Sequence, residues 1–149
     1  MIQRIQTLYL LIAVIIMIAL NWMPLAYFGD LEFLTCGIFS EPGITAISIT
    51  TYPIAVTVIA SAILAAIAIF MYKNRIKQAK IVALSIFLDV MFYPIFTAYL
   101  WYSKEALANI DNSFSFALII PAISIILKAL ANKAIKSDEK LVRSADRIR

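Results

Sequence analysis

The stretch PIAVTVIASAILAAIAIFMY, residues 53–72, decides the fold of this chain, because it is apolar over its whole length and contains no charge. A helix of about 20 such residues crosses the roughly 30 Å hydrocarbon core of a bilayer. The basic sequence KNRIKQAK follows directly, at residues 73–80. Basic residues gather in the cytoplasmic loops of membrane proteins. Together the two stretches predict a transmembrane helix whose second end lies at the cytoplasmic surface.

Three further segments are apolar over a similar length, at residues 7–27, 81–102 and 114–131. The chain of 149 residues is 63% hydrophobic and 15% charged, whereas soluble domains carry about 25% charged residues. Backbone groups in lipid must be paired internally, so these segments should be helices. We therefore expect an all-α membrane protein, a single domain with four transmembrane helices. The first segment is interpreted as an uncleaved span, because no small-residue cleavage site follows it.

The distribution of basic residues predicts the orientation. Twelve of the thirteen Lys and Arg residues occupy three places: Arg4, residues 73–80, and the segment from Lys128 to the C-terminus. Four spans put these places on one side of the membrane and only Lys104 on the other. The positive-inside rule then places both termini in the cytoplasm. Since the basic residues adjoin a membrane surface, we expect membrane lipids as partners and no nucleic acid.

The outer loop at residues 28–52 is expected to form a β-hairpin. Its two candidate strands are DLEFLTCGIF (30–39) and ITAISITTY (44–52), and Pro42–Gly43 between them suits a type II turn. An irregular loop is the alternative. Cys36 is the single cysteine, so no internal disulfide can form, and we expect its thiol to be buried.

The residue types that support most catalytic chemistry are scarce. The chain has no histidine, one cysteine and three glycines, so it lacks the commonest general base, a metal-ligand cluster and a phosphate-binding loop. We therefore expect no enzyme activity, no metal and no cofactor.

Asp89 is the residue that most needs an explanation. It lies nine residues beyond Lys80, which is about 13 Å along a helix and so near the middle of a bilayer. Ser85 and Tyr93 share its helix face, one turn away on either side. An ionisable group at this depth is a functional-site hypothesis. One interpretation is a proton or cation relay; the favoured one is a hydrogen-bonded tie between helices, in which Asp89→Asn would preserve stability.

Several polar residues of the other spans are candidate partners for Asp89: Thr57, Ser61, Ser124 and Lys128. Lys128 lies close to the expected end of the fourth span, so we expect its side chain to extend to the cytoplasmic surface. Asn21 is a further polar residue within the spans.

Thr57, Ser61 and Ala65 recur at helical spacing along the second span. Such small residues allow membrane helices to approach closely. Packing inside the bundle is the favoured interpretation, and a docking face for another protein is the alternative.

Residues 133–149 form a charged tail that should be cytoplasmic. Ser137 is a candidate N-cap for a short amphipathic helix; a continuation of span four is the alternative. An apolar stripe of Leu141, Ala145 and Ile148 runs among charged residues of both signs, which include Lys140, Arg143, Asp146 and Arg147. Because acidic residues fit a lipid surface poorly, this mixture favours a docking site for a protein partner.

The opening MIQRIQTLYLLIA (1–13) and the closing IKSDEKLVRSADRIR (135–149) resemble the two ends of a Bacteroidota family of small four-span inner-membrane proteins of unknown function. The resemblance covers the whole length. It implies a bacterial inner membrane and supplies no catalytic residues. Family members are often labelled as transcription termination factor Rho, but this chain lacks the P-loop of such a motor. The resemblance also suggests that MIQRIQ and DEKLVRSADR pack side by side.

These features predict a non-catalytic accessory or scaffold subunit of an inner-membrane assembly, which docks other membrane proteins through its cytoplasmic ends. The second hypothesis is a small transporter or ion-coupled membrane protein that uses Asp89 and acts as a homo-oligomer. A lipid-handling protein with its site under the outer hairpin is the third.

Overall fold

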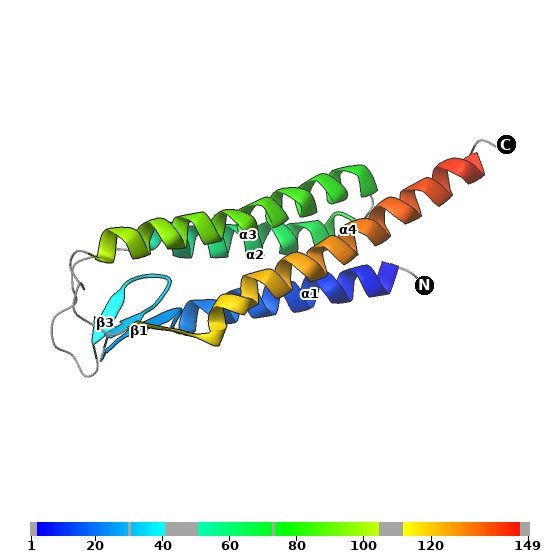
Figure 1. The fold of residues 1–149 in the computed structure, drawn as a ribbon. Helices are drawn as coiled ribbons and strands as arrows, with labels where there is room; N and C mark the ends of the chain where they lie inside the picture. The colour runs from blue at the N-terminus through cyan, green and yellow to red at the C-terminus, as the bar shows by residue number, and fades with distance from the viewer. Residues whose placement is uncertain (1–2, 30, 41–50, 73, 105–111, 147–149) are drawn as a thin grey trace.

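The structure, a computed structural model, describes residues 3–29, 31–40, 51–72, 74–104 and 112–146. Four long helices dominate it: α1 (Gln3–Ala19), α2 (Tyr52–Phe70), α3 (Arg75–Lys104) and α4 (Ile119–Asp146) (Figure 1). Short 3-10 helices at Leu20–Trp22 and Phe116–Leu118 extend the first and precede the last. All four long helices are apolar and long enough to cross a membrane, as the sequence predicted.

The four long helices form a closed antiparallel bundle. Each helix packs against its neighbours in the chain, and α1 also packs against α4. A small sheet covers one end of the bundle, while both termini and the α2–α3 connection lie at the other end (Figure 1). These ends are called the sheet end and the terminal end below.

The sheet has four short antiparallel strands: β1 (Ala26–Phe28), β2 (Leu31–Phe33), β3 (Ile38–Ser40) and β4 (Asn112–Phe114), in the order β3-β2-β1-β4. Two hairpins join the first three strands. Phe28 pairs with Leu31, which leaves a two-residue turn that begins at Gly29 with a φ of 57°. Phe33 pairs with Ile38, and Leu34 N–H donates to the Gly37 carbonyl at 2.9 Å. β4 comes from the loop before α4 and pairs with β1.

The expectation of β-structure between the first two helices is confirmed, but the expected strand bounds were wrong in the described part. The segment expected to be one strand, residues 30–39, contains two strands and the turn between them. The signal for the first turn was present in the sequence, because Gly followed by Asp between apolar residues favours a two-residue hairpin turn. The proposed turn at Pro42–Gly43 lies outside the described residues. Cys36 is exposed, which corrects the expectation of a buried thiol.

Two helix boundaries also differ from the expected spans. The first helical segment ends at Trp22 rather than residue 27, and Met23 is extended, with φ −103° and ψ 136°. Pro24 explains this end, because the residue before a proline is disfavoured in helical conformation. α4 begins only at Ile119, since Phe114 belongs to β4, and it continues unbroken to Asp146. Ser137 consequently lies inside α4 and is no N-cap, so the alternative of a continued fourth helix is confirmed.

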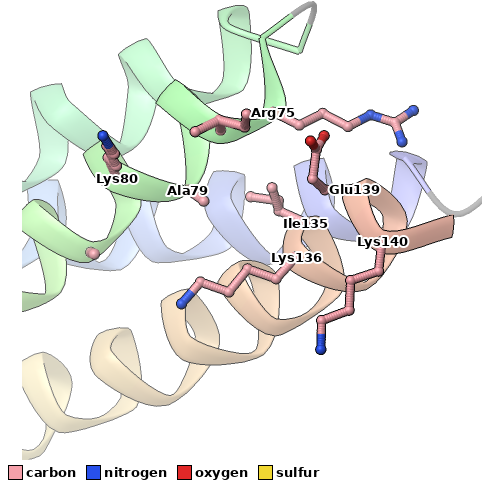
Figure 2. A pocket seen from close by; sticks show the side chains of 9 residues that line it. Arg75, Ala79, Lys80, Ile135, Lys136, Glu139 and Lys140 are labelled. Atoms are coloured by element: carbon pink, nitrogen blue, oxygen red, sulfur yellow. The ribbon is translucent and has the colours of Figure 1, made fainter. Parts of the chain in front are cut away.

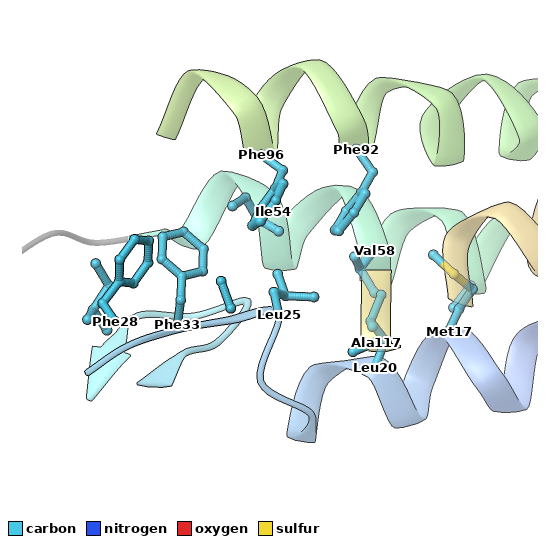
Figure 3. Close-up of a cluster of buried hydrophobic side chains, with 13 residues drawn as sticks. Met17, Leu20, Leu25, Phe28, Phe33, Ile54, Val58, Phe92, Phe96 and Ala117 are labelled. Carbon is cyan, nitrogen blue, oxygen red and sulfur yellow. The ribbon is translucent and has the colours of Figure 1, made fainter. Parts of the chain in front are cut away.

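Aromatic side chains fill the space between the sheet and the helices. Phe33 from β2 meets Phe96 of α3 edge-on, with ring centroids 5.6 Å apart, and Phe92 stacks on Phe96 at 6.0 Å. Leu25 and Ile54 lie in the same buried cluster (Figure 3). Burial of a large apolar side chain contributes about 1.5–3 kcal/mol, so this cluster fixes the sheet on the bundle.

Candidate functional site

A group of five buried polar residues lies in the middle of the bundle. Its members come from three helices and are each 0% exposed: Ser61 of α2, Ser85 and Asp89 of α3, and Ser124 and Lys128 of α4. We call these five residues the polar cluster. Their positions follow from helical spacing, because Ser85 and Asp89, like Ser124 and Lys128, are four residues apart and so share a helix face.

An ion pair forms the centre of the polar cluster. Lys128 Nζ lies 2.7 Å from Asp89 Oδ2 and also donates to Ser61 Oγ at 2.6 Å. Ser124 Oγ donates to Asp89 Oδ2 at 2.9 Å, and Ser61 Oγ donates to Asp89 Oδ1. The carboxylate therefore receives hydrogen bonds from both α2 and α4, which ties three helices together.

Ser61 and Ser85 add a second tie between α2 and α3. Ser85 Oγ donates to the Ser61 carbonyl at 2.9 Å, and Ser61 Oγ lies 3.3 Å from the Ser85 carbonyl. Such reciprocal contacts require the two backbones to approach closely, which small side chains permit. Ala65, one turn along α2, is also fully buried. Packing inside the bundle, the favoured interpretation of this stripe, is confirmed for Ser61 and Ala65.

Apolar side chains bound the polar cluster on both sides along the bundle. Toward the sheet end lie Val58, Phe92 and Ala117. Toward the terminal end lie Leu10, Ala68, Val82, Ala131 and Ile135. A charge without a partner in such surroundings would cost several kcal/mol. The mutual pairing of Asp89 and Lys128 is thus what allows either charge to exist there.

Lys128 was expected to reach the cytoplasmic surface, and that prediction was wrong. Side chains on a helix tilt toward its N-terminus. The N-terminus of α4 lies at the sheet end, so Lys128 leans into the bundle toward Asp89 rather than out of it. Its role as a partner of Asp89, the other possibility raised by the sequence, is confirmed.

Three predicted site residues lie outside the polar cluster. Tyr93 shares the face of Asp89 but donates its hydroxyl to the Leu118 carbonyl at 3.1 Å. Thr57 donates to the Ile54 carbonyl of its own helix at 2.8 Å and is only partly buried. Asn21 donates to the carbonyls of Met17 and Ile18 and accepts from Thr35. It therefore closes the end of α1 and holds the turn between β2 and β3.

At the terminal end, Asp138 of α4 contacts both α1 and α3. Gln6 Nε2 donates to Asp138 Oδ2 at 2.6 Å, and both side chains are buried. Arg75 Nη1 donates to the Asp138 carbonyl at 3.1 Å. Gln6 belongs to MIQRIQ and Asp138 to DEKLVRSADR, so the expected packing of the two sequence ends is confirmed at this contact. Sequence reasoning did not single out Gln6, although a polar residue on the buried face of α1 was a visible signal.

Beyond Asp138 the helix carries the predicted docking residues. Lys140 and Leu141 are exposed, Leu141 at 60%, and the adjacent Val142 is 44% exposed. Arg143, Ala145 and Asp146 lie within α4, but the structure does not describe their side chains. Arg147 and Ile148 lie outside the described residues. Figure 1 shows this part of α4 extending beyond the ends of the other helices.

The described residues offer little that would hold a metal ion. In the parts of the chain that the structure describes, no three acidic, cysteine or histidine side chains come together.

Chemically, the polar cluster is a closed set of donors and acceptors. It can stabilise a bundle, or exchange a proton between its two charged members if water reaches it.

The sequence over residues 2–148 matches a family described as a domain of unknown function, DUF4293. This agrees with the resemblance to an uncharacterised family that covers the whole chain. None of the curated proteins matches this sequence.

Proposed function

Since the chain belongs to the DUF4293 family, whose function is unknown, we propose its role from the structure: a non-catalytic accessory or scaffold subunit of a membrane protein assembly. It docks its partner through the part of α4 beyond Asp138. We further propose a bacterial inner membrane, which the family resemblance implies. Both termini would lie in the cytoplasm, because the basic residues concentrate at the terminal end.

One observation carries this proposal: α4 continues as a helix to Asp146 and extends beyond the ends of the other helices (Figure 1). Leu141 and Val142 expose large apolar surfaces on this extension. A helix that needed only to span a bilayer would have no use for these residues beyond Asp138. Helices with an exposed apolar stripe among charges commonly dock on a partner protein.

The polar cluster supports a structural role for Asp89 in this proposal. Every member of the cluster has a partner within the cluster, and apolar side chains adjoin it on both sides. The alternative, a transporter that uses Asp89, is favoured by one observation, because a buried acid–base pair between membrane helices can relay protons. It requires water or an ion to reach residues that are 0% exposed.

Truncation tests the docking proposal. The affinity-tagged full chain and a variant that lacks residues 140–149 are extracted in mild detergent, and co-purifying proteins are quantified by mass spectrometry. We expect a stoichiometric partner with the full chain and its loss from the truncated chain. Lys133→Gln is the control, because Lys133 is exposed on the same helix before the extension, and it should retain the partner.

Two results would contradict the proposal. A full chain that purifies only as a homo-oligomer, with no stoichiometric partner, would favour the transport alternative. A truncated chain that fails to insert or is degraded at once would show that the extension belongs to the fold.

A further inference from the structure

A groove between α3 and α4 opens near the terminal end (Figure 2). Its volume is about 410 Å³, and its apolar lining includes Ala79 and Ala83 of α3 and Ile135 of α4. The two alanines create the space, because a larger side chain at either position would occupy it. We call this feature the α3–α4 groove.

The rim of the groove is strongly basic. Lys80 and Arg75 line it from α3, and Lys136 and Lys140 from α4, with Glu139 as the one acidic lining residue. In Figure 2 the Glu139 carboxylate points toward the Arg75 side chain, while the ammonium groups of Lys136 and Lys140 extend away from both. The three lysines therefore leave a positive potential over the apolar part of the groove.

An apolar groove with a basic rim fits an amphiphile with an anionic head. Basic pockets between transmembrane helices at the cytoplasmic side bind anionic lipid head groups, and lysine ammonium groups are suitable point charges for a phosphate. A free anion would leave the lining of Ala79, Ala83 and Ile135 without a function. A peptide helix would not need the concentration of positive charge.

We propose that the α3–α4 groove is a binding site for one anionic phospholipid. Lys80, Lys136 and Lys140 supply positive charge around the anionic head, and one acyl chain lies along Ala83 and Ile135. The bound lipid bridges α3 and α4 next to the point where α4 leaves the bundle. This site shares Lys140 with the docking proposal, but its test does not depend on that proposal, since Lys80 and Lys136 lie outside residues 140–149.

The chain provides a matched control for this site. Lys77 and Lys133 are exposed lysines on the same two helices and lie near the same end of the bundle, but neither lines the groove. The double variants Lys80→Gln/Lys136→Gln and Lys77→Gln/Lys133→Gln each remove two positive charges, one from α3 and one from α4. A difference in lipid binding between the two variants therefore shows binding in the groove, and not a general attraction of anionic lipid to a basic surface.

Native mass spectrometry of the purified full chain measures the binding. The probes are dioleoyl-phosphatidylglycerol, dioleoyl-phosphatidylcholine with the same acyl chains, and inorganic phosphate. We expect retention of one phosphatidylglycerol in preference to phosphatidylcholine. Loss of two lysines near an anionic head should weaken this binding about 30-fold in Lys80→Gln/Lys136→Gln. The Lys77→Gln/Lys133→Gln variant should stay within about twofold of the native chain.

Ala83→Trp tests the acyl part of the site without a change in charge. It fills the groove from a position that is exposed in the native bundle, so the fold should tolerate it, and phosphatidylglycerol binding should fall. Equal losses in the two lysine variants would show general surface attraction and overturn the proposal. Equal retention of phosphatidylcholine would overturn it too, as would binding of inorganic phosphate as strong as that of the lipid. Displacement of the lipid by a co-purified protein would assign the groove to that protein.

Discussion

The middle of the bundle and the projecting end of α4 both contain polar and charged residues within a largely apolar chain, yet they differ in where their partners lie. In the polar cluster, Asp89 and Lys128 are fully buried and satisfied by each other and by serines of the same chain. In the extension of α4, Lys140, Leu141 and Val142 are exposed. The polar groups of the cluster are therefore satisfied within the chain, whereas the extension of α4 presents side chains that a partner can contact.

This difference suggests how to assign a role to a polar residue in a membrane protein. A charged residue at membrane depth is by default a candidate functional residue. A buried ion pair whose groups are all hydrogen-bonded can equally have a structural role in the bundle. The extension of α4 has no comparable structural necessity. Variants in the two regions should therefore affect different measurements, namely stability in the middle and association at the end.

The largest effect is expected from removal of one member of the buried ion pair. Asp89→Asn leaves Lys128 buried without its counter-ion, and breaking a buried pair in this way costs about 3–5 kcal/mol. This replaces the sequence-based expectation that Asp89→Asn preserves stability, which was made with the Lys128 side chain expected at the cytoplasmic surface. Thermal denaturation in detergent would measure the loss.

The double variant Asp89→Asn/Lys128→Met sharpens this test. It removes both charges, while the Asn amide can accept from one of Ser61 and Ser124 through its oxygen and donate to the other through its nitrogen, so it should be more stable than Asp89→Asn alone. Under the structural role it also keeps its partner protein. A double variant as unstable as the single one would show that the pair is not the source of the effect. A folded double variant without transport activity would instead support a relay.

A smaller loss is expected from Ser61→Ala. This change removes one of the two acceptors for Lys128 and a donor to Asp89, and loss of a partner for a buried polar group costs about 1–3 kcal/mol. Thr57→Ala, one turn away on α2, is the control, because the Thr57 hydroxyl bonds only within its own helix. Similar denaturation temperatures for the two variants would argue against a tie between helices at Ser61.

Gln6→Ala tests the boundary between the two regions. Gln6 is the buried partner of Asp138 at the point where α4 leaves the bundle, and its loss should cost about 1–2 kcal/mol. Because the Gln6 contact joins the end of α4 to α1, hydrogen exchange should also become faster in the final turns of α4. Ile5→Ala, at an exposed neighbouring position, should change neither measurement. Unaltered exchange in Gln6→Ala would show that the extension is held by other contacts.

The sequence predicted the parts of the structure that depend on local composition. Four helices follow from apolar length alone, and the inward face of Asp89 follows from helical spacing. The four-stranded sheet was not predictable in the same way, because β1 pairs with β4 from a distant part of the chain. The burial of Lys128 depended on the direction in which α4 runs past α3. Ser137 has the local character of an N-cap, but the ties of Asp138 to α1 and α3 hold α4 in one continuous helix.

The smallest effect on stability, and a clear effect on association, is expected from Leu141→Ser. Leu141 is 60% exposed, and surface substitutions usually change stability by less than about 0.5 kcal/mol. If Leu141 anchors the partner, its loss should weaken binding by more than about fivefold, as for the truncation of an interface hot spot. Partner retention in mild detergent and thermal denaturation of the same samples give the two measurements.

Ser144→Ala is the matched control for Leu141→Ser, because the Ser144 hydroxyl donates to the Leu141 carbonyl within the helix and its loss leaves the Leu141 side chain in place. Retention of the partner by Leu141→Ser would remove this residue from the docking surface. A large loss of stability in Leu141→Ser would show that the extension packs on its own bundle, and the contrast between a self-contained middle and an open end would then fail.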